Sequence, residues 1–353
     1  MLNLFGNLME SFMAVPWYYP HIVEIVRSAD WLVHNFRAEN IDIYDAVSYQ
    51  HNLQVEDVKY QVILDVNFLQ YLLDMVKKPE SNELSRIAAA YLTFFQISGM
   101  ELEPALAIYE KINYSNDRAE EAITNLEQFR GIDNHSLDEL AAYALGYKQQ
   151  LCISPMVDNE REKLREGLLR YKRLTDWGSL YLCVLKITDI STDTSIPRPQ
   201  KLLAFIEWCI TEFRFSLAAL VYAAALFGIS PAKKMMKYKA KEETQKRSAA
   251  LQNMTWDLYY VDRYMKSWVS KDERTENLML TADKGLKLTM QLAIKCQHTE
   301  GLTPLRPHLA EEQFQNIEAV YSSRDSVKRA YKSEKWSYDY RNSLITKYES
   351  KLL

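Results

Sequence analysis

The run Val58-Lys-Tyr-Gln-Val-Ile-Leu-Asp65 constrains the fold of this chain more than any other segment. It is short, apolar and rich in β-branched residues, which is typical of a buried strand. A helix-forming run, Phe68 to Val76, follows it at once. A strand that passes directly into a helix is typical of a sheet whose strands are covered by helices.

Two further short segments have the character of strands, Gly99 to Glu103 and Asn277 to Thr281. Each is followed by a helical pattern, over Ala105 to Ile112 and over Leu286 to Ala293 respectively. Only 9 glycines and 10 prolines occur in 353 residues, so the composition favours helix elsewhere. Strands separated by helices predict a parallel sheet with helices on both faces.

Most of the remaining sequence has helical periodicity, including an expected N-terminal helix from His21 to Phe36. Within the long helical block after Ser115 the pattern predicts helices over 116–130, 136–149, 158–174, 200–227 and 232–253. The expected organisation is an N-terminal helical segment (1–57), a core (58–112 with 250–296), a helical insertion (113–249) and a helical tail (297–353).

Several classes of protein are excluded or disfavoured. The four cysteines stand far apart without a CxxC pair, so we expect buried free thiols rather than a zinc site or disulfides. The first fifteen residues contain Glu10 and lack a basic start, unlike a signal peptide, and Phe215 to Phe227 is too short to span a bilayer. We expect a soluble cytoplasmic protein without membrane association. Glycine-rich phosphate loops, GxSxG elbows and HExxH helices do not occur in the sequence.

Four acidic residues have settings that suit a metal site. Asp65 ends the first strand, and Asp283 closes Leu278-Met-Leu-Thr-Ala-Asp-Lys284 after the third. Glu110 lies in the helix that begins after Pro104, and Asp257 lies near the expected start of a helix over Thr255 to Trp268. Ligands of such sheets bind at the carboxyl ends of the strands. Because phosphodiester hydrolysis needs charge neutralisation and an activated water, and because Mg²⁺ or Mn²⁺ prefers carboxylate oxygen, these acids predict metal-dependent hydrolysis.

These residues resemble the PIN-like nuclease family. Its members share a strand that ends in Asp-x-Asn, a helix with Pro-Ala followed by Glu, a later helix that opens on Asp, and a strand that ends in Thr-x-Asp. The matching residues here are, in that order, Asp65 with Asn67; Pro104, Ala105 and Glu110; Asp257; and Thr281 with Asp283. The resemblance covers residues 58–112 and 250–295, under half of the chain. The long helical segment between the second and third motifs departs from the compact members of the family.

The resemblance implies a fold, a cofactor and an activity. The implied fold is a three-layer α/β/α sandwich with a short parallel sheet, here with a large all-helical insertion and helical termini. The implied cofactor is Mg²⁺ or Mn²⁺, held by Asp65, Glu110, Asp257 and Asp283. Asn67 and Thr281 would support these ligands. The implied activity is metal-dependent endonucleolytic cleavage of RNA.

The choice of acids leaves alternatives open. Glu101 or Glu103 can replace Glu110, because both flank the end of the second expected strand. Asp262 can assist Asp257 only from outside the first set of ligands, because five residues along a helix turn its direction by about 140°. Each carboxylate taken singly is also explained as a solvated surface acid or as a helix cap.

Basic residues directly before Asp257 form a candidate surface for nucleic acid. Lys233, Lys234, Lys237 and Lys239 can bind phosphates, and Tyr238 can offer a stacking face. A solvated helix face explains the same pattern equally well. A weaker candidate is the tail, whose basic and aromatic residues are Arg324, Lys328, Arg329, Tyr331, Lys332, Lys335, Trp336, Tyr338, Tyr340 and Arg341.

Three functions therefore compete. The leading one is a metal-dependent endoribonuclease, whose partners are RNA and, through the insertion, a protein regulator or a second copy of the chain. The second is a helical interaction module on a catalytically silent PIN-like core. The third is a structure-specific DNA nuclease. The sequence does not choose among toxin, defence and RNA-processing roles.

Overall fold

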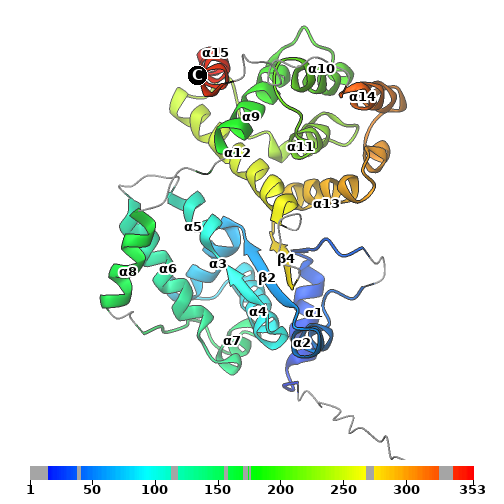
Figure 1. Cartoon of the computed structure of the whole chain (residues 1–353). Helices are drawn as coiled ribbons and strands as arrows, with labels where there is room; N and C mark the ends of the chain where they lie inside the picture. Colours follow the sequence, from blue (N-terminus) through cyan, green and yellow to red (C-terminus); the bar gives the residue numbers. More distant parts are fainter. Residues whose placement is uncertain are drawn as a thin grey trace, which may run out of the picture.

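The computed structural model covers the whole chain and describes residues 15–37, 41–112, 118–154, 158–169, 174, 176–267, 274–325 and 337–353 (Figure 1). These residues form a mostly helical protein around one small sheet. The strands are β1 (Leu32–Val33), β2 (Lys59–Leu64), β3 (Glu101–Glu103) and β4 (Thr275–Leu280). The helices of the first half are α1 (Tyr19–Ala29), α2 (Ala46–Val55), α3 (Val66–Lys77), α4 (Glu83–Ser98), α5 (Ala105–Ile112), α6 (Ala119–Asp133), α7 (Leu137–Ala144) and α8 (Asp158–Leu169).

The second half supplies a further group of helices and two short 3₁₀ turns. They are α9 (Trp177–Thr192), α10 (Arg198–Thr211), α11 (Leu217–Phe227), η2 (Lys233–Met235), α12 (Thr244–Ser267), α13 (Lys284–His298), η3 (Thr303–His308), α14 (Glu311–Ser323) and α15 (Tyr338–Leu352). Figure 1 shows α9 to α15 gathered at one end of the molecule and α1 to α8 at the other, with β2 and β4 between them. Within the described ranges, no helix combines the length and the apolar character that crossing a bilayer requires.

The sheet is mixed and has the order β1-β4-β2-β3. Strand β2 is parallel to both β3 and β4, whereas β1 is antiparallel to β4. The register pairs Leu64 with Leu280, so Asp65 follows β2 at the point where Thr281 follows β4. The carboxyl ends of the two central strands therefore meet at one edge of the sheet, as the sequence predicts.

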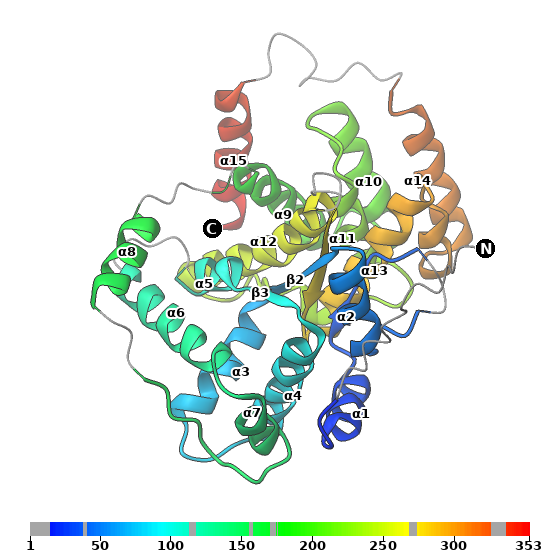
Figure 2. The ribbon, with the colours of Figure 1, turned by 60° about the horizontal axis from the view of Figure 1, so that its bottom comes forward.

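Alternating residues of the sheet enter two separate hydrophobic cores. Val62 and Leu64 of β2 pack in a core with α1 to α7, and Ile63 between them packs in a core with α9 to α15. Strand β4 alternates in the same way, with Met279 on the side of α9 to α15. Strands buried on both faces have continuous apolar sequences rather than alternating ones. The structure thus confirms an α/β architecture with helices on both faces of the sheet, which Figure 2 shows from another side.

Several expected elements differ from the structure. The helix expected over 21–36 ends at Ala29, and β1 follows it as an unexpected antiparallel edge strand. The helix expected over 200–227 is two helices, because a loop at 212–216 divides α10 from α11. The helix expected over 232–253 is wrong at its start, where η2 and an irregular segment precede α12. Residues 170–173, part of the helix expected over 158–174, lie outside the described residues.

The cysteines are free, and Cys183, Cys209 and Cys296 are buried as expected. Cys152 is exposed, which contradicts the expectation for this one thiol.

Candidate active site

Asp65 and Thr281 join the ends of the two central strands. The hydroxyl of Thr281 donates to Oδ2 of Asp65 at 2.6 Å and accepts from the backbone N–H of Asp283 at 3.1 Å. Oδ1 of Asp65 accepts from the N–H of Phe68 at 2.7 Å and caps α3. Burial raises the pKa of Asp65 to about 6, although these two hydrogen bonds oppose the rise, and the charges of Asp283 and Asp257 add to it.

Asp283 caps α13 in the same manner. Its Oδ1 accepts from the N–H groups of Gly285 at 2.8 Å and Leu286 at 3.1 Å. An acid at each of these N-caps is explained in part by the exposed N–H groups and the positive dipole of a helix start. Capping occupies only Oδ1 of Asp283, so Oδ2 remains available to a ligand.

Glu110 extends toward the same region from α5, which packs against β2 and α3. Part of its side chain is exposed, but Oε2 is buried. Burial raises the pKa of Glu110 to about 8, the charges of Asp257 and Asp65 add to the rise, and Tyr260 and Lys237 oppose it. The hydroxyl of Tyr260 is also buried beside it, and hydrogen bonding between Tyr260 and Glu110 is the reason that Tyr260 opposes the rise.

Asp257 completes the group from α12, on the side of the sheet that Ile63 and Met279 face. It lies in the middle of this helix, which begins at Thr244, so the expectation of a helix that starts near Asp257 is wrong. Its side chain is buried, and Oδ2 forms an ion pair with Nζ of Lys237 at 2.8 Å. Burial raises the pKa of Asp257 in spite of Lys237. Burial by itself would lower the pKa of Lys237. The negative charges of Asp257, Glu110 and Asp283, together with the hydrogen bond to Asp257, hold this pKa above its ordinary value.

The four predicted acids are thus brought together as one electrostatically coupled group, which we call the acid cluster (Asp65, Glu110, Asp257 and Asp283). A buried group of carboxylates is costly unless cations balance it. Lys237 supplies one such cation. In the part of the chain that the structure describes, no three His, Cys, Asp or Glu side chains already converge closely enough to hold a metal ion.

The donor set nevertheless fits a hard divalent cation. All four ligand groups are carboxylates, the cap of α13 uses Oδ1 of Asp283 and not Oδ2, and the net charge of the cluster favours a cation. Thr281 holds two of the acids in place, as supporting residues of metal sites do.

Other predicted site residues lie elsewhere. Asp262 forms an ion pair with Lys266 at 2.7 Å and lines a small cavity with Asp176, so it does not belong to the acid cluster. Asn67 is exposed on the first turn of α3 and does not support Asp65 through a hydrogen bond that the structure records. Glu103 accepts from the N–H of Ala105 at 2.8 Å and caps α5.

The three candidates for the second acid differ in position. Glu101 is exposed on β3, and Glu103 is used as a cap. Glu110 alone of the three couples to Asp257 and Asp65.

The predicted basic surface is divided by the fold. Lys233 and Lys234 are exposed, and Lys239 is exposed near Glu242, at 3.9 Å. Tyr238 is buried and its hydroxyl donates to the backbone oxygen of Leu352 at 2.7 Å, so its ring does not offer the expected stacking face. Lys237 lies in the acid cluster rather than on an outer surface.

Most of the basic tail lies at 326–336, outside the described residues. The described parts contact the protein itself: the Arg324 guanidinium lies 3.9 Å from the centre of the Tyr321 ring, and the Tyr340 hydroxyl donates to the backbone oxygen of Glu212.

Two members of the site were not predicted in their observed roles, Lys237 as the counter-ion and Tyr260 as a neighbour of Glu110. For Tyr260 a signal existed, because it follows Asp257 by three residues and so shares its helix face.

Comparison of the chain with protein-family models, with curated proteins and with solved structures found no match.

Proposed function

We propose that this protein is a metal-dependent endonuclease that hydrolyses phosphodiester bonds, with RNA as the preferred substrate. The observation that supports the proposal is the acid cluster. Residues as far apart in sequence as Asp65 and Asp283 meet at the carboxyl ends of two adjacent parallel strands, buried enough to raise the pKa of Asp65 and Glu110. Carboxylates are brought together at such a cost chiefly where a cation or a reaction requires them.

Asp65, Glu110, Asp257 and Asp283 would hold Mg²⁺ or Mn²⁺. When bound, such an ion neutralises phosphate charge and makes water a better nucleophile. Thr281 keeps Asp65 and Asp283 in fixed positions through its hydroxyl. Lys237 is placed to exchange Asp257 for a phosphate oxygen of the substrate, because its ammonium group already lies at the cluster.

Cleavage of labelled single-stranded RNA and DNA in Mn²⁺ or Mg²⁺ tests the proposal. We expect metal-dependent cutting by the wild type and its loss in Glu110→Gln, since Gln keeps the size of the side chain but supplies no carboxylate to a metal ion. Glu103→Gln is the matched control, because this acid caps α5 outside the cluster. Preferred cleavage of single-stranded RNA would indicate a ribonuclease. Preferred cleavage of single-stranded DNA or of a DNA flap would indicate a structure-specific DNA nuclease. Absence of cutting in every substrate would refute the proposal.

A catalytically silent core is the second candidate, and the ion pair between Lys237 and Asp257 favours it. A resident lysine can balance the cluster permanently and make a metal unnecessary. The two candidates differ in their response to Mn²⁺. A metal site raises the melting temperature of the wild type but not of Glu110→Gln, because a ligand that binds only the folded state stabilises it. A silent core shows no such difference between the two proteins.

A further inference from the structure

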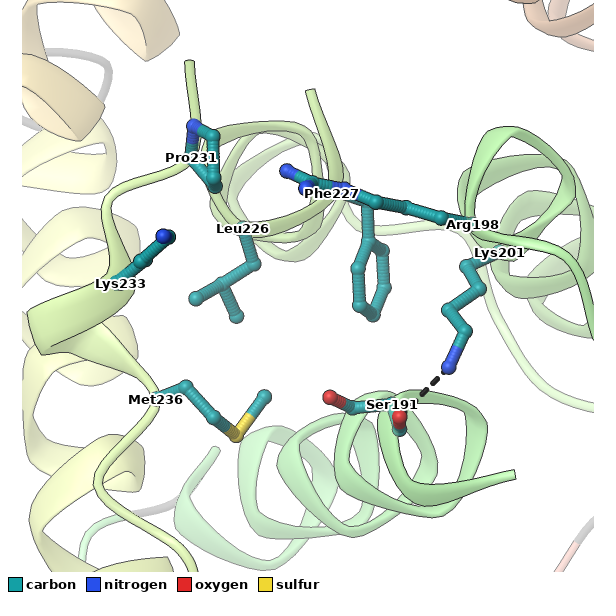
Figure 3. Close-up of a pocket in the computed structure, with 8 residues that line it drawn as sticks. All are labelled: Ser191, Arg198, Lys201, Leu226, Phe227, Pro231, Lys233 and Met236. Atoms are coloured by element: carbon teal, nitrogen blue, oxygen red, sulfur yellow. Dashed lines mark hydrogen bonds between the residues drawn. The ribbon is translucent and has the colours of Figure 1, made fainter. Parts of the chain in front are cut away.

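A pocket apart from the acid cluster lies between α9, α10, α11 and the segment that contains η2 (Figure 3). Its volume is about 400 Å³, within the range of sites for small ligands. Leu226, Phe227 and Met236 point into it, and Arg198, Lys201 and Lys233 stand around it. None of the side chains that line this pocket in the described structure is acidic. It therefore combines an apolar floor with a positive rim, and Asp193, which does not line the pocket, balances part of the charge of Lys201.

The three cations keep donors available for a ligand. Arg198 uses one N–H to donate to the backbone oxygen of Gly228 at 3.0 Å. Lys201 donates to the backbone oxygens of Ser191 at 2.6 Å and Asp193 at 3.1 Å, which leaves one of its three protons. Lys233 is exposed, and its amino group has no hydrogen bond or ion pair with any residue that the structure describes. The first two side chains are thus held in place by backbone contacts while the third is free to close on a ligand.

Charge and shape together define the ligand. A single carboxylate would leave most of the positive rim unbalanced, whereas a phosphomonoester carries a charge of roughly −1.5 to −2 at neutral pH and has three acceptor oxygens. An arginine beside two lysines suits such a group, since the guanidinium can bind two of its oxygens at once. The ring of Phe227 and the thioether of Met236 suit a planar or apolar body attached to the phosphate.

We propose that this pocket binds a phosphomonoester with a planar apolar body, with the phosphate on Arg198, Lys201 and Lys233 and the body on Leu226, Phe227 and Met236. The ligand is either a free molecule of nucleotide size or the phosphorylated end of a nucleic-acid strand. The pocket shares no residue with the acid cluster, so the proposal does not rest on nuclease activity.

Binding of 1-naphthyl phosphate to the full chain in EDTA tests the pocket, with 1-naphthol and inorganic phosphate as the two half-ligands. EDTA removes divalent metal, so cleavage cannot interfere. We expect 1-naphthyl phosphate to bind at least about tenfold more tightly than either half, because charged hydrogen bonds and apolar burial act together. Equal binding of inorganic phosphate alone, or no binding at millimolar concentration, would overturn the proposal.

Neighbouring lysines provide a matched pair of variants. Lys233→Ala removes a cation from the rim, and Lys234→Ala removes an exposed cation that does not line the pocket. We expect the first to raise the Kd about tenfold and the second to leave it unchanged, since the contact is a charge-assisted hydrogen bond. Both side chains are exposed, so neither change threatens folding. An equal effect of both variants would show non-specific attraction and refute the site.

Competition then identifies the source of the phosphate. Displacement by adenosine 5′-monophosphate but not by a 5′-phosphorylated hexanucleotide supports a free small ligand. Displacement by the phosphorylated strand but not by its 5′-hydroxyl counterpart supports a strand end. Equal displacement by the two strands would mean that the pocket contacts phosphodiesters, which contradicts the proposal.

Discussion

Replacing Glu110 by Gln should stabilise the metal-free protein at alkaline pH. The pKa of this carboxyl rises from 4.5 to about 8 on folding, because it is buried beside Asp257 and Asp65. A carboxyl whose pKa is higher in the folded state is protonated at pH values below its unfolded pKa, and there its burial costs no electrostatic free energy. It then destabilises the folded state progressively as pH rises through the window between the two values, because the unfolded chain releases its proton first.

The magnitude follows from that window. One unit of difference in pKa corresponds to about 1.4 kcal/mol, so the interval from 4.5 to about 8 gives a penalty on the order of 5 kcal/mol at pH 9. Asp65, whose pKa rises to about 6, contributes with the same sign in both proteins and largely cancels in the comparison. Gln cannot ionise, so the variant lacks the part of the pH dependence that Glu110 causes.

Urea denaturation in EDTA, followed from pH 5 to pH 9, measures this difference. We expect nearly equal free energies of unfolding at pH 5, where Glu110 is protonated in the folded protein, and a more stable variant at pH 9. Glu103→Gln should keep the wild-type dependence because Glu110 is intact in it. Parallel curves for the wild type and Glu110→Gln would show that Glu110 is not buried near like charges. A variant that gains stability while it loses Mn²⁺-dependent cleavage would identify a residue retained for function.

Two further substitutions, each with a matched control, test the bridge between Thr281 and Asp65 and the packing of η3 against α11. Both are measured in the same urea denaturation assay. Thr281→Val should cost about 1.5–3 kcal/mol, because it removes the hydroxyl that donates to the buried carboxylate of Asp65. Thr289→Val, at an equally buried threonine that donates within its own helix, should cost about 1 kcal/mol or less, and equal costs would contradict the bridging role. Gly228→Ala would place its Cβ 2.5 Å from the carbonyl oxygen of the last residue of η3 and should cost about 1–3 kcal/mol. Gly301→Ala, whose new Cβ would lie 3.7 Å from the nearest atom, should change the free energy of unfolding by about 0.5 kcal/mol or less. Equal free energies of unfolding for the two variants would refute the packing of η3 against α11.

The local sequence determined strands β2, β3 and β4 and two of the four acids. Strand β2 is evident in Val62-Ile-Leu64 because a strand buried on both faces needs an uninterrupted apolar run. Asp65 and Asp283 each stand between a strand and a helix, and capping a helix is a local interaction that involves residues two or three positions ahead. Both the positions of these acids and their approach across adjacent parallel strands could therefore be predicted.

Tertiary structure decided the rest of the site. The resemblance favoured Glu110 but left Glu101 and Glu103 as alternatives, and only the packing of α5 against β2 and α3 brings Glu110 toward Asp65. The two-residue strand β1 carries no periodic signal of its own and exists because it pairs with β4. Contacts of this kind join residues far apart in the chain, and hydrophobic periodicity does not record them.

The segment after α11 shows the same limit most clearly. Its lysines suggest one exposed helical face, but the fold places Lys237 against Asp257, buries Tyr238 and turns Lys233 toward a separate pocket. Alanine and lysine favour helix locally, yet burial of Met235 and Tyr238 and the ion pair with Asp257 hold an irregular course. The sequence by itself determined which residue types were available for a charged site. Long-range packing decided which of them meet, because the energy of burying charge depends on neighbours that only the folded chain supplies.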